Sequence, residues 1–290
     1  MAVFVTYPIV VVQIGKLEVG IQLMRMKLVN FWLVMLLTPV TLSAEQPIVN
    51  VCDDQAEFPP YTYYERVNGQ KNTSKISGAM MDVLTEITKL TGFSFSVKLL
   101  PWSRCLYEIA TKDKFEMYMN AIYTKKRGEM AYMTKRIYTM SRGYWYSKEK
   151  YPNGLVIDFM DELKNYRLLG VYGWSYETYG IQDEDKIFVG KGKNYSNAFE
   201  MLKMGRGDIL LGGYPVAYGF ESVGQKIAPN GFQWSTISSA PPSEFHIFIS
   251  KRSPRAKELL TKINQAIDTL NKDNTIDTIF KHYIQCGKHC

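Results

Sequence analysis

The sequence has few of the residues from which metal and nucleic-acid sites are built. Its 290 residues include only three histidines, and His246, His282 and His289 lack the spacing of a zinc finger. The net charge is +7, but the lysines and arginines are spread along the chain rather than gathered in a block. This distribution is typical of a solvated surface. We therefore expect no metal, no cofactor and no nucleic-acid partner, and His246, which alternates with apolar neighbours, is predicted to be structural.

The N-terminus has the pattern of a secretory signal peptide. A short basic segment precedes an almost wholly apolar run over residues 28–40, and Ala44 supplies a small residue before the expected cleavage point. The apolar run is too short to span a membrane comfortably, which argues against a transmembrane anchor. Because residues 1–23 precede a complete signal, the true start is expected at Met24 or Met26. Cleavage would leave 246 of the 290 residues, enough for two lobes, and would lower the net charge from +7 to +5.

The four cysteines all follow this segment, and an even number of cysteines in a secreted chain predicts disulfides. Cys286 and Cys290 are close in sequence and could close a small loop. Neither they nor Cys52 and Cys105 lie beside a plausible general base, so a catalytic thiol is not expected.

The apolar pattern after the signal is that of an α/β protein. Residues 47–52 are predicted to form a buried strand. Residues 80–90 repeat apolar side chains at helical spacing up to Gly92, and residues 93–100 alternate as a strand does. This β-α-β order begins an α/β lobe. Residues 67–77, between the first strand and the helix, are predicted to be a polar loop.

Arg127 is the first candidate for ligand binding. Residues 115–121 predict a buried strand, and Thr124 is a good N-cap for a helix that follows it. Arg127 would then lie in the first helical turn at the C-terminal edge of a sheet, exposed in a cleft where it contributes little to folding. Its guanidinium can grip a carboxylate bidentately, and the N–H groups of the capped turn add donors. On this stretch alone, a surface arginine among lysines is the favoured interpretation.

The flanking residues change that balance. The segment from Phe115 to Arg127, followed by Tyr132, Met133 and Tyr138, resembles a motif of the extracytoplasmic solute-binding proteins that serve polar amino-acid ABC transporters. In that family a strand leads to small residues, then Thr-x-x-Arg, then an aromatic-rich segment, and the arginine binds the ligand's α-carboxylate. The resemblance extends over nearly the whole chain after residue 45. It implies an α/β, two-lobed, type II periplasmic-binding-protein fold, with two chain crossovers and a ligand cleft between the lobes.

The resemblance also implies how the chain is divided. We expect the signal and its extension over residues 1–44, the first lobe over residues 45–142 and 241–290, and the second lobe over residues 143–240. If the strands before Cys52 and Cys105 are neighbours, as in the family, a Cys52–Cys105 disulfide is sterically reasonable.

The predicted site draws on both lobes. Phe58, stiffened by two prolines, and Trp102 stand where the family places a ligand-stacking ring or cleft-lining residues, although simple packing is the alternative for each. Residues 174–178 are predicted to begin a helix capped by Ser175 that presents hydroxyl and N–H groups to the carboxylate. The ligand-binding residues expected from the resemblance are Asn120, Ile122, Thr124, Arg127, Phe58, Trp102, Trp174, Ser175, Tyr176, Gly213 and Tyr214.

The sequence departs from the family at one position. A helix, a turn from Gly205 to Asp208 and a strand follow the family pattern, in which the strand commonly ends in an acidic residue that pairs with the ligand's ammonium. Gly213 stands there instead, and no acidic residue follows before Glu221. A buried ammonium without acceptors is costly. Ligands without a free α-ammonium are therefore expected to bind at least as well as standard amino acids, whereas the anion site is unaffected.

The function predicted from these observations is that of a monomeric, non-enzymatic periplasmic protein that closes by hinge motion on a small carboxylate-bearing, amino-acid-like solute. An ABC transporter permease or a sensor domain would read the closed form. The alternatives are a chemosensory binding protein without a transporter and an enzyme on the same fold, such as a dehydratase. Asp53, Asp54 and Glu57 are candidate acids or bases for an enzyme, but none has a paired partner with a defined role.

Overall fold

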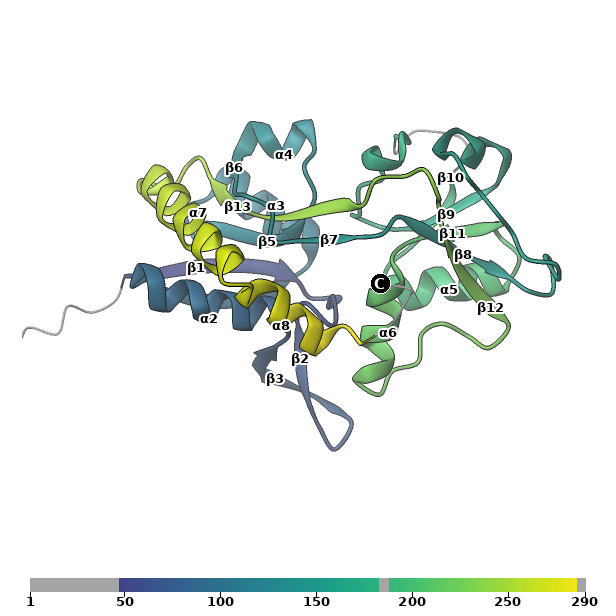
Figure 1. Cartoon of the computed structure of the whole chain (residues 1–290), viewed down its shortest axis with the longest axis horizontal. Helices are drawn as coiled ribbons and strands as arrows, with labels where there is room; N and C mark the ends of the chain where they lie inside the picture. The colour runs from purple at the N-terminus through teal and green to yellow at the C-terminus, as the bar shows by residue number, and fades with distance from the viewer. Residues whose placement is uncertain (1–46, 183–187, 286–290) are drawn as a thin grey trace, which may run out of the picture. The chain divides into compact units, whose positions relative to one another are not determined.

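The computed structural model describes residues 47–182 and 188–285. The predicted signal segment and the cysteines at 286 and 290 lie outside these ranges. The described chain contains two larger sheets flanked by helices and one separate two-stranded hairpin (Figure 1). No helix in this part of the chain is long and apolar enough to cross a membrane.

The first sheet has the strand order β4-β1-β5-β13-β6, with β7 paired to β13. Strands β4, β1 and β5 run parallel, and β13 returns antiparallel to β5. The carboxyl ends of the three parallel strands therefore meet at one edge, where ligands of open α/β sheets bind. The strands are β1 (Ile48–Asp54), β4 (Ser94–Leu100), β5 (Met117–Ala121), β6 (Ala131–Met133), β7 (Tyr138–Met140) and β13 (Ser243–Ser250).

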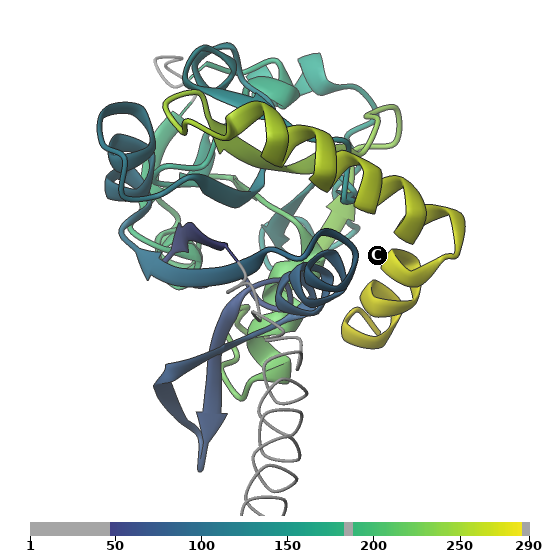
Figure 2. The same ribbon diagram turned by 90° about the vertical axis from the view of Figure 1, so that its left-hand side faces the viewer.

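Alternate residues of these strands pack into two separate cores. Val49, Val51, Met117 and other residues on the same face of the sheet pack with helices α2, α7 and α8, which lie together in Figures 1 and 2. Cys52 and Tyr118, which point to the opposite face, pack with helix α3. Helix α2 ends as predicted at Gly92, whose φ of 73° makes a left-handed cap. The helices are α2 (Ala79–Thr91), α3 (Trp102–Thr111), α4 (Lys125–Met130), α7 (Ala256–Lys272) and α8 (Thr275–Tyr283).

The predicted disulfide between Cys52 and Cys105 is present and joins β1 to α3, with the Cα atoms 5.7 Å apart. The prediction is confirmed for this pair. His246 is structural, as predicted. Its Nδ1 lies 2.9 Å from the carbonyl oxygen of Thr134, and burial lowers its pKa.

The second sheet has the strand order β10-β9-β11-β8-β12. Strands β9, β10 and β11 are parallel, and β8 runs antiparallel to β11 and β12. The chain passes from β7 of the first sheet to β8 of the second and returns from β12 to β13. This confirms the predicted α/β fold with two lobes and two crossovers. The elements are β8 (Gly143–Ser147), η1 (Met160–Asn165), β9 (Leu168–Val171), η2 (Glu177–Tyr179), β10 (Phe188–Gly192), α5 (Tyr195–Lys203), β11 (Ile209–Leu211), α6 (Tyr214–Ser222) and β12 (Phe232–Thr236).

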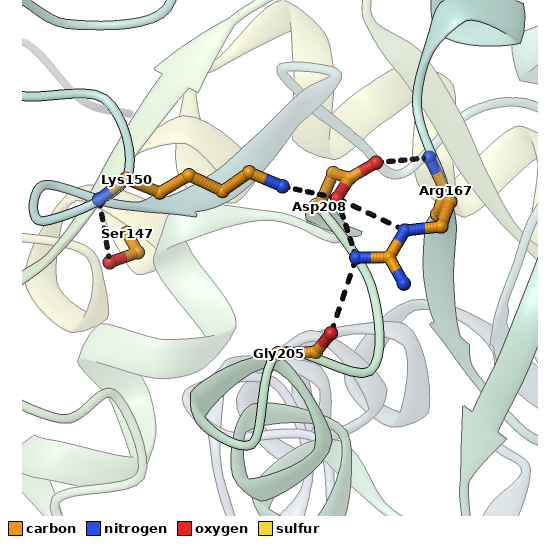
Figure 3. A network of polar contacts seen from close by, with 5 residues as sticks. All are labelled: Ser147, Lys150, Arg167, Gly205 and Asp208. Carbon is orange, nitrogen blue, oxygen red and sulfur yellow. Dashed lines mark hydrogen bonds and ion pairs between the residues drawn. The ribbon is translucent and has the colours of Figure 1, made fainter.

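Asp208 joins three segments of the second lobe (Figure 3). Its carboxylate accepts hydrogen bonds from the Arg167 backbone at 2.8 Å and the Arg167 guanidinium at 2.9 Å, and it pairs with Lys150. Arg167 also donates to the carbonyl of Gly205 at 3.2 Å. Burial raises the pKa of Asp208, but the bonds from Arg167 and Lys150 outweigh it and hold the pKa well below its usual range. The ionised carboxylate of Asp208 thus fixes the turn before β11.

Two local predictions are wrong. The segment predicted to be a polar loop is largely a hairpin of β2 (Tyr63–Val67) and β3 (Gln70–Ser77), which extends from the first lobe in Figure 2. Strand β3 is polar at all but one position and gives no alternating signal, although Asn68 and Gly69, both with positive φ, form a typical hairpin turn. The helix predicted over residues 174–178 is only the short 3-10 turn η2, which ends at Gly180.

Candidate functional site

A cavity of about 90 Å³ lies between the two lobes and is lined by residues of both. The first lobe contributes the ends of β1 and β5 and part of α4, and the second contributes residues 173–176, 178–179 and 212–213. Met140, Ser243 and Phe245, on the strands that lead into the crossovers, complete the wall. Any solute in this cavity would contact both lobes and the connections between them.

Arg127 is held in this wall by the start of α4. Its backbone N–H donates to the Thr124 hydroxyl at 3.1 Å, so Thr124 is the N-cap, as predicted. Its Nη1 donates to the carbonyl of Ile122 at 2.8 Å, and its Cζ lies 5.6 Å from the centre of a Trp102 ring. Arg127 is only 7 % exposed, so the expectations of an exposed cleft arginine and of a surface arginine are both wrong.

The charge on Arg127 has no counter-ion in the part of the chain that the structure describes. No carboxylate of residues 47–182 or 188–285 lies within ion-pair distance of its guanidinium. Burial lowers the pKa of Arg127, while the nearby Tyr118 and Glu177 act in the opposite direction. A buried cation is costly unless it is paired. Its remaining donors therefore form a ready site for an anion that enters the cavity.

Asp53 lies at the carboxyl end of β1 in the same cavity and is 2 % exposed. Its Oδ2 accepts a hydrogen bond from Asn120 at 2.6 Å, and its Oδ1 accepts one from the Asp54 N–H at 2.8 Å. Burial raises the pKa of Asp53 to about 7; the negative charge of Asp54 adds to the rise, whereas these hydrogen bonds oppose it. A carboxylate here is poorly stabilised by its surroundings and would gain from a cationic partner.

Asn120 connects Asp53 to the crossover. Its Nδ2 also lies 2.8 Å from the Thr62 hydroxyl, and its Oδ1 accepts a hydrogen bond from Tyr138 on β7 at 3.0 Å. Asn120 has a φ of 56°, a left-handed conformation that asparagine tolerates better than most residues. One side chain thereby holds the acidic group of the cavity and a strand that leads to the second lobe.

The two neighbouring acids differ in their surroundings. Asp54 is half-buried and lines the cavity, and burial raises its pKa. Glu57 lies outside the cavity, in ion pairs with Arg66 at 2.8 Å and with Lys71. Burial raises the pKa of Glu57, but these partners outweigh the effect and the pKa is lowered. Asp53 and Asp54 are therefore the carboxylates available to a bound solute.

Aromatic rings form much of the remaining wall. Phe58 meets Trp174 edge to face, with ring centroids 5.5 Å apart, and thereby joins the two lobes. The Tyr176 hydroxyl accepts a hydrogen bond from the N–H of Val171 at 2.7 Å, which fixes this ring at the end of β9. Such a wall suits the apolar body of a small solute.

The structure brings most of the predicted site residues together. Those that line the cavity are Phe58, Trp102, Asn120, Ile122, Arg127, Trp174, Ser175, Tyr176 and Gly213. Their roles in ligand binding stay predictions. Thr124 and Tyr214 are not part of the lining, and Tyr214 instead stacks on Trp145 with ring centroids 5.6 Å apart.

Sequence reasoning missed several residues of the lining. Asp53 and Asp54 were considered as acids of an enzyme but not as ligand partners, although their place at the end of a predicted parallel strand could have indicated it. Thr178 ends the wrongly predicted helix and Tyr179 follows it, and the Thr178 hydroxyl is buried without a hydrogen-bond partner among the described residues. Ser243 lines the cavity because the second crossover returns the chain to the first lobe at this residue, and no local sequence pattern predicts that position.

The sequence from residue 50 to residue 286 matches the profile of the bacterial extracellular solute-binding proteins, family 3, and the chain belongs to this family. A search of curated proteins gives no significant match.

Several solved structures share the fold. The arginine-, lysine-, histidine-binding protein ArtJ from Geobacillus stearothermophilus superposes with a TM-score of 0.63 at 16% identity, over 85% of this chain and 97% of that one. The ancestral amino acid-binding protein AncCDT-1, a precursor of cyclohexadienyl dehydratase, gives 0.61 at 18% identity, over 82% and 96%. A histidine kinase sensor domain with similarity to periplasmic binding proteins gives 0.61 at 13% identity, over 83% and 97%.

Proposed function

We propose that this protein is a periplasmic solute-binding protein whose lobes close on a small amino-acid-like solute that carries both a carboxylate and a cationic group. The observation that carries the proposal is the pair of opposite charges in one cavity. Arg127 is buried there without a counter-ion among the described residues, and Asp53 and Asp54 line the same space.

At one end of the solute, a carboxylate would bind Arg127. The guanidinium uses Nη1 on the Ile122 carbonyl, which orients its plane and leaves further donors for two parallel hydrogen bonds. Removal of the water around a buried cation makes this interaction stronger than one on the surface. The carboxylate would replace the counter-ion that the described part of the chain does not supply.

At the other end, a cationic group would bind the acids of β1. The expectation that solutes without an α-ammonium bind at least as well as amino acids came from Gly213, which does line the cavity and contributes no charge. Asp53 and Asp54 supply the acidic partner from the first lobe instead, so we now propose a zwitterionic solute. A cation beside Asp53 would stabilise the ionised carboxylate and lower its raised pKa.

Closure would follow from contacts to both lobes. We propose that the first lobe comprises residues 45–142 and 241–290, that the second comprises residues 143–240, and that the hinge lies in the crossovers between them. A solute that contacts both lobes stabilises the closed form by its differential affinity. The closed, monomeric protein would deliver the solute to an ABC transporter permease, or signal to a sensor domain where no transporter is present.

One observation favours a second candidate, an enzyme on the same fold. A carboxyl group with a pKa of about 7 that faces the same cavity as a guanidinium has the properties of a general acid or base. A dehydratase-like elimination would use both groups. Incubation of the protein with a bound solute, followed by mass spectrometry of that solute, separates binding from turnover.

The binding proposal is tested by a thermal-shift screen of amino acids, ω-amino acids, organic acids and polyamines. A solute at 100 times its Kd adds about 2.7 kcal/mol to the free energy of unfolding. We expect zwitterions to raise the Tm of the wild type and to have no effect on Arg127→Ala. Arg206→Ala, which removes an exposed arginine outside the cavity, is the matched control. Equal shifts in Arg127→Ala and the wild type would refute the proposal.

A further inference from the structure

The wall of the cavity contains two hydroxyl groups whose hydrogen atoms find no acceptor in the described part of the chain. The Thr178 hydroxyl is buried and has no hydrogen-bond partner there. Ser243 is only 6 % exposed, and its hydroxyl oxygen accepts a hydrogen bond from Nε of Arg142 at 3.1 Å but donates to no described residue. Both residues line the cavity, so a solute that enters it can supply the acceptors that buried hydroxyls need.

These hydroxyls come together through the chain connections rather than through one local segment. Ser243 begins β13 directly after the second crossover and pairs with Met140, the last residue of β7. Arg142 lies in the first crossover, shortly after β7, so its bond to Ser243 joins the two connections. Thr178 lies in the turn η2 of the second lobe. The cavity therefore has a third set of polar groups, in addition to Arg127 and the acids of β1.

The orientation of the Ser243 hydroxyl follows from its partner. A guanidinium donates hydrogen bonds and cannot accept one, so the Ser243 hydroxyl oxygen is turned toward Arg142 and its hydrogen is directed elsewhere. The Arg142 Nη1 lies 3.6 Å from the sulfur of Met160, which is only a weak acceptor. Ser243 is thus left as a donor beside a guanidinium whose charge these two contacts do not neutralise.

The charge of Arg142 decides which kind of group this region favours. Glu244, the acid next to Ser243, pairs with the exposed Arg136 at 3.1 Å, and Arg142 forms no ion pair with any residue that the structure describes. Burial raises the pKa of Tyr179, a residue of the cavity wall, to about 12, while a backbone hydrogen bond and the charge of Arg142 oppose the rise. The positive charge therefore acts on the cavity wall, where it favours an anion over a cation.

We infer that Ser243, Thr178 and Arg142 form a second anion subsite and that the solute is a small amino dicarboxylate. The inference rests on the proposed function and deepens it. One carboxylate of the solute binds Arg127, its ammonium binds the acids of β1, and its second carboxylate accepts hydrogen bonds from the Ser243 and Thr178 hydroxyls. Arg142 is a positioning residue, because it orients Ser243 and its charge favours a carboxylate over a neutral amide of the same shape.

Pairs of solutes with the same shape test the subsite. Glutamate and aspartate differ from glutamine and asparagine only in that an amide NH₂ replaces one carboxylate oxygen. Calorimetry would measure the affinity of the wild type for all four solutes. We expect at least one of the two acids to bind roughly 10- to 100-fold more tightly than its amide, since hydrogen bonds to a charged group are the stronger ones. Equal affinity for acid and amide in both pairs would overturn the inference and leave the proposed function intact.

Removal of either hydroxyl should lower the ratio of acid affinity to amide affinity. We expect this ratio to fall about tenfold in Ser243→Ala and in Thr178→Val, whereas Thr178→Ser keeps the hydroxyl and the ratio. Ser239→Ala is the matched control. It removes a hydroxyl of the second crossover that donates to the Asp158 carbonyl at 2.6 Å, outside the cavity lining. An unchanged ratio in either Ser243→Ala or Thr178→Val contradicts the subsite.

The role of Arg142 is tested by the same ratio. Arg142→Gln should lose most of the preference for the acid, and Arg142→Lys, which keeps the charge, should retain part of it. A bond that only joins the two crossovers would instead change the affinities for acid and amide equally in Arg142→Gln, and that result would refute the assignment. Arg136→Gln removes a nearby exposed charge and should leave the ratio unchanged.

Glutarate, which has two carboxylates and no amine, separates this inference from the proposed function. If glutarate binds about tenfold more weakly to Ser243→Ala than to the wild type while no amino acid binds, the subsite stands and the proposal of a zwitterionic solute is wrong. If neither glutarate nor any of the four amino acids binds the wild type, the inference is wrong, and the thermal-shift screen alone decides the proposed function.

Discussion

Replacement of Asp53 by asparagine should make the solute-free protein more stable at pH 8 and less stable near pH 4. Burial raises the pKa of Asp53 from 3.8 to about 7. The folded protein therefore keeps this proton up to about pH 7, whereas the unfolded chain releases it near pH 4. The contribution of Asp53 to the free energy of unfolding of the wild type therefore falls as the pH rises from about 4 to about 7, and it stays constant above pH 7.

The size of the effect follows from the shift. The pKa of Asp53 rises by about three, and each pKa unit changes the free energy of unfolding by about 1.36 kcal/mol. At pH 8 the ionised carboxylate therefore lowers the free energy of unfolding by about 4 kcal/mol. Asparagine carries no charge and so avoids this penalty. In the wild type, however, both carboxylate oxygens of Asp53 accept hydrogen bonds, one of them from the Asn120 Nδ2 at 2.6 Å, and the NH₂ group of an asparagine cannot replace one of these acceptors. A buried donor without an acceptor costs about 1–3 kcal/mol. We expect a net gain of about 1–3 kcal/mol at pH 8 and a loss of similar size near pH 4.

The assay is urea unfolding of solute-free wild type and Asp53→Asn at both pH values. Asp208→Asn is the control with the opposite sign. Arg167 and Lys150 hold the pKa of Asp208 below its usual range, so its carboxylate stabilises the fold above about pH 4 and loses that contribution as the pH falls further. If the difference between Asp53→Asn and the wild type is the same at pH 4 and pH 8, the assigned burial of Asp53 is wrong.

Three further predictions follow from the same geometry. Affinity for a zwitterionic solute should rise about tenfold between pH 6 and pH 8 as Asp53 ionises, and calorimetry that shows no change would contradict its role. Joint replacement of Cys52 and Cys105 by alanine should cost about 4 kcal/mol in urea unfolding, because the bond spans 53 residues of sequence. Gly213→Ala places a Cβ 2.3 Å from the Met140 Sδ, so this variant should bind the solute more weakly. Binding should partly recover in the Gly213→Ala, Met140→Ala double variant. Unchanged affinity in the single variant would exclude Gly213 from the site.

The fold was predictable because its signals are local. The helical spacing of α2, the stop at Gly92 and the cap at Thr124 each depend on a few neighbouring residues, and all three are present. The Cys52–Cys105 bond could be anticipated once β1 and β4 were taken as neighbours. The hairpin from Tyr63 to Ser77 gave no such signal, because β3 is polar at all but one position.

The electrostatic state of the site was not predictable in the same way. Arg127 was expected to be exposed, since no residue near it in sequence indicates that Trp102 and the second lobe cover it. The raised pKa of Asp53 likewise depends on burial among segments that are distant in the sequence, such as that of Asn120. Sequence therefore indicated which side chains are present at the sheet edge, but the balance of burial and charge depends on contacts between distant segments.

The most direct test of the central claim is a double-mutant cycle between Arg127 and the carboxylate of a solute found in the screen. Calorimetry would compare the binding of that solute and of its carboxamide to the wild type and to Arg127→Ala. Arg127→Lys keeps the positive charge but loses the two parallel hydrogen bonds of a guanidinium, so it separates the two contributions. A hydrogen bond to a charged group is worth about 1.5–3 kcal/mol, so the carboxamide should bind the wild type roughly 10- to 100-fold more weakly, and Arg127→Ala should show no such preference. The same preference for the carboxylate in both proteins would contradict the claim that Arg127 anchors it.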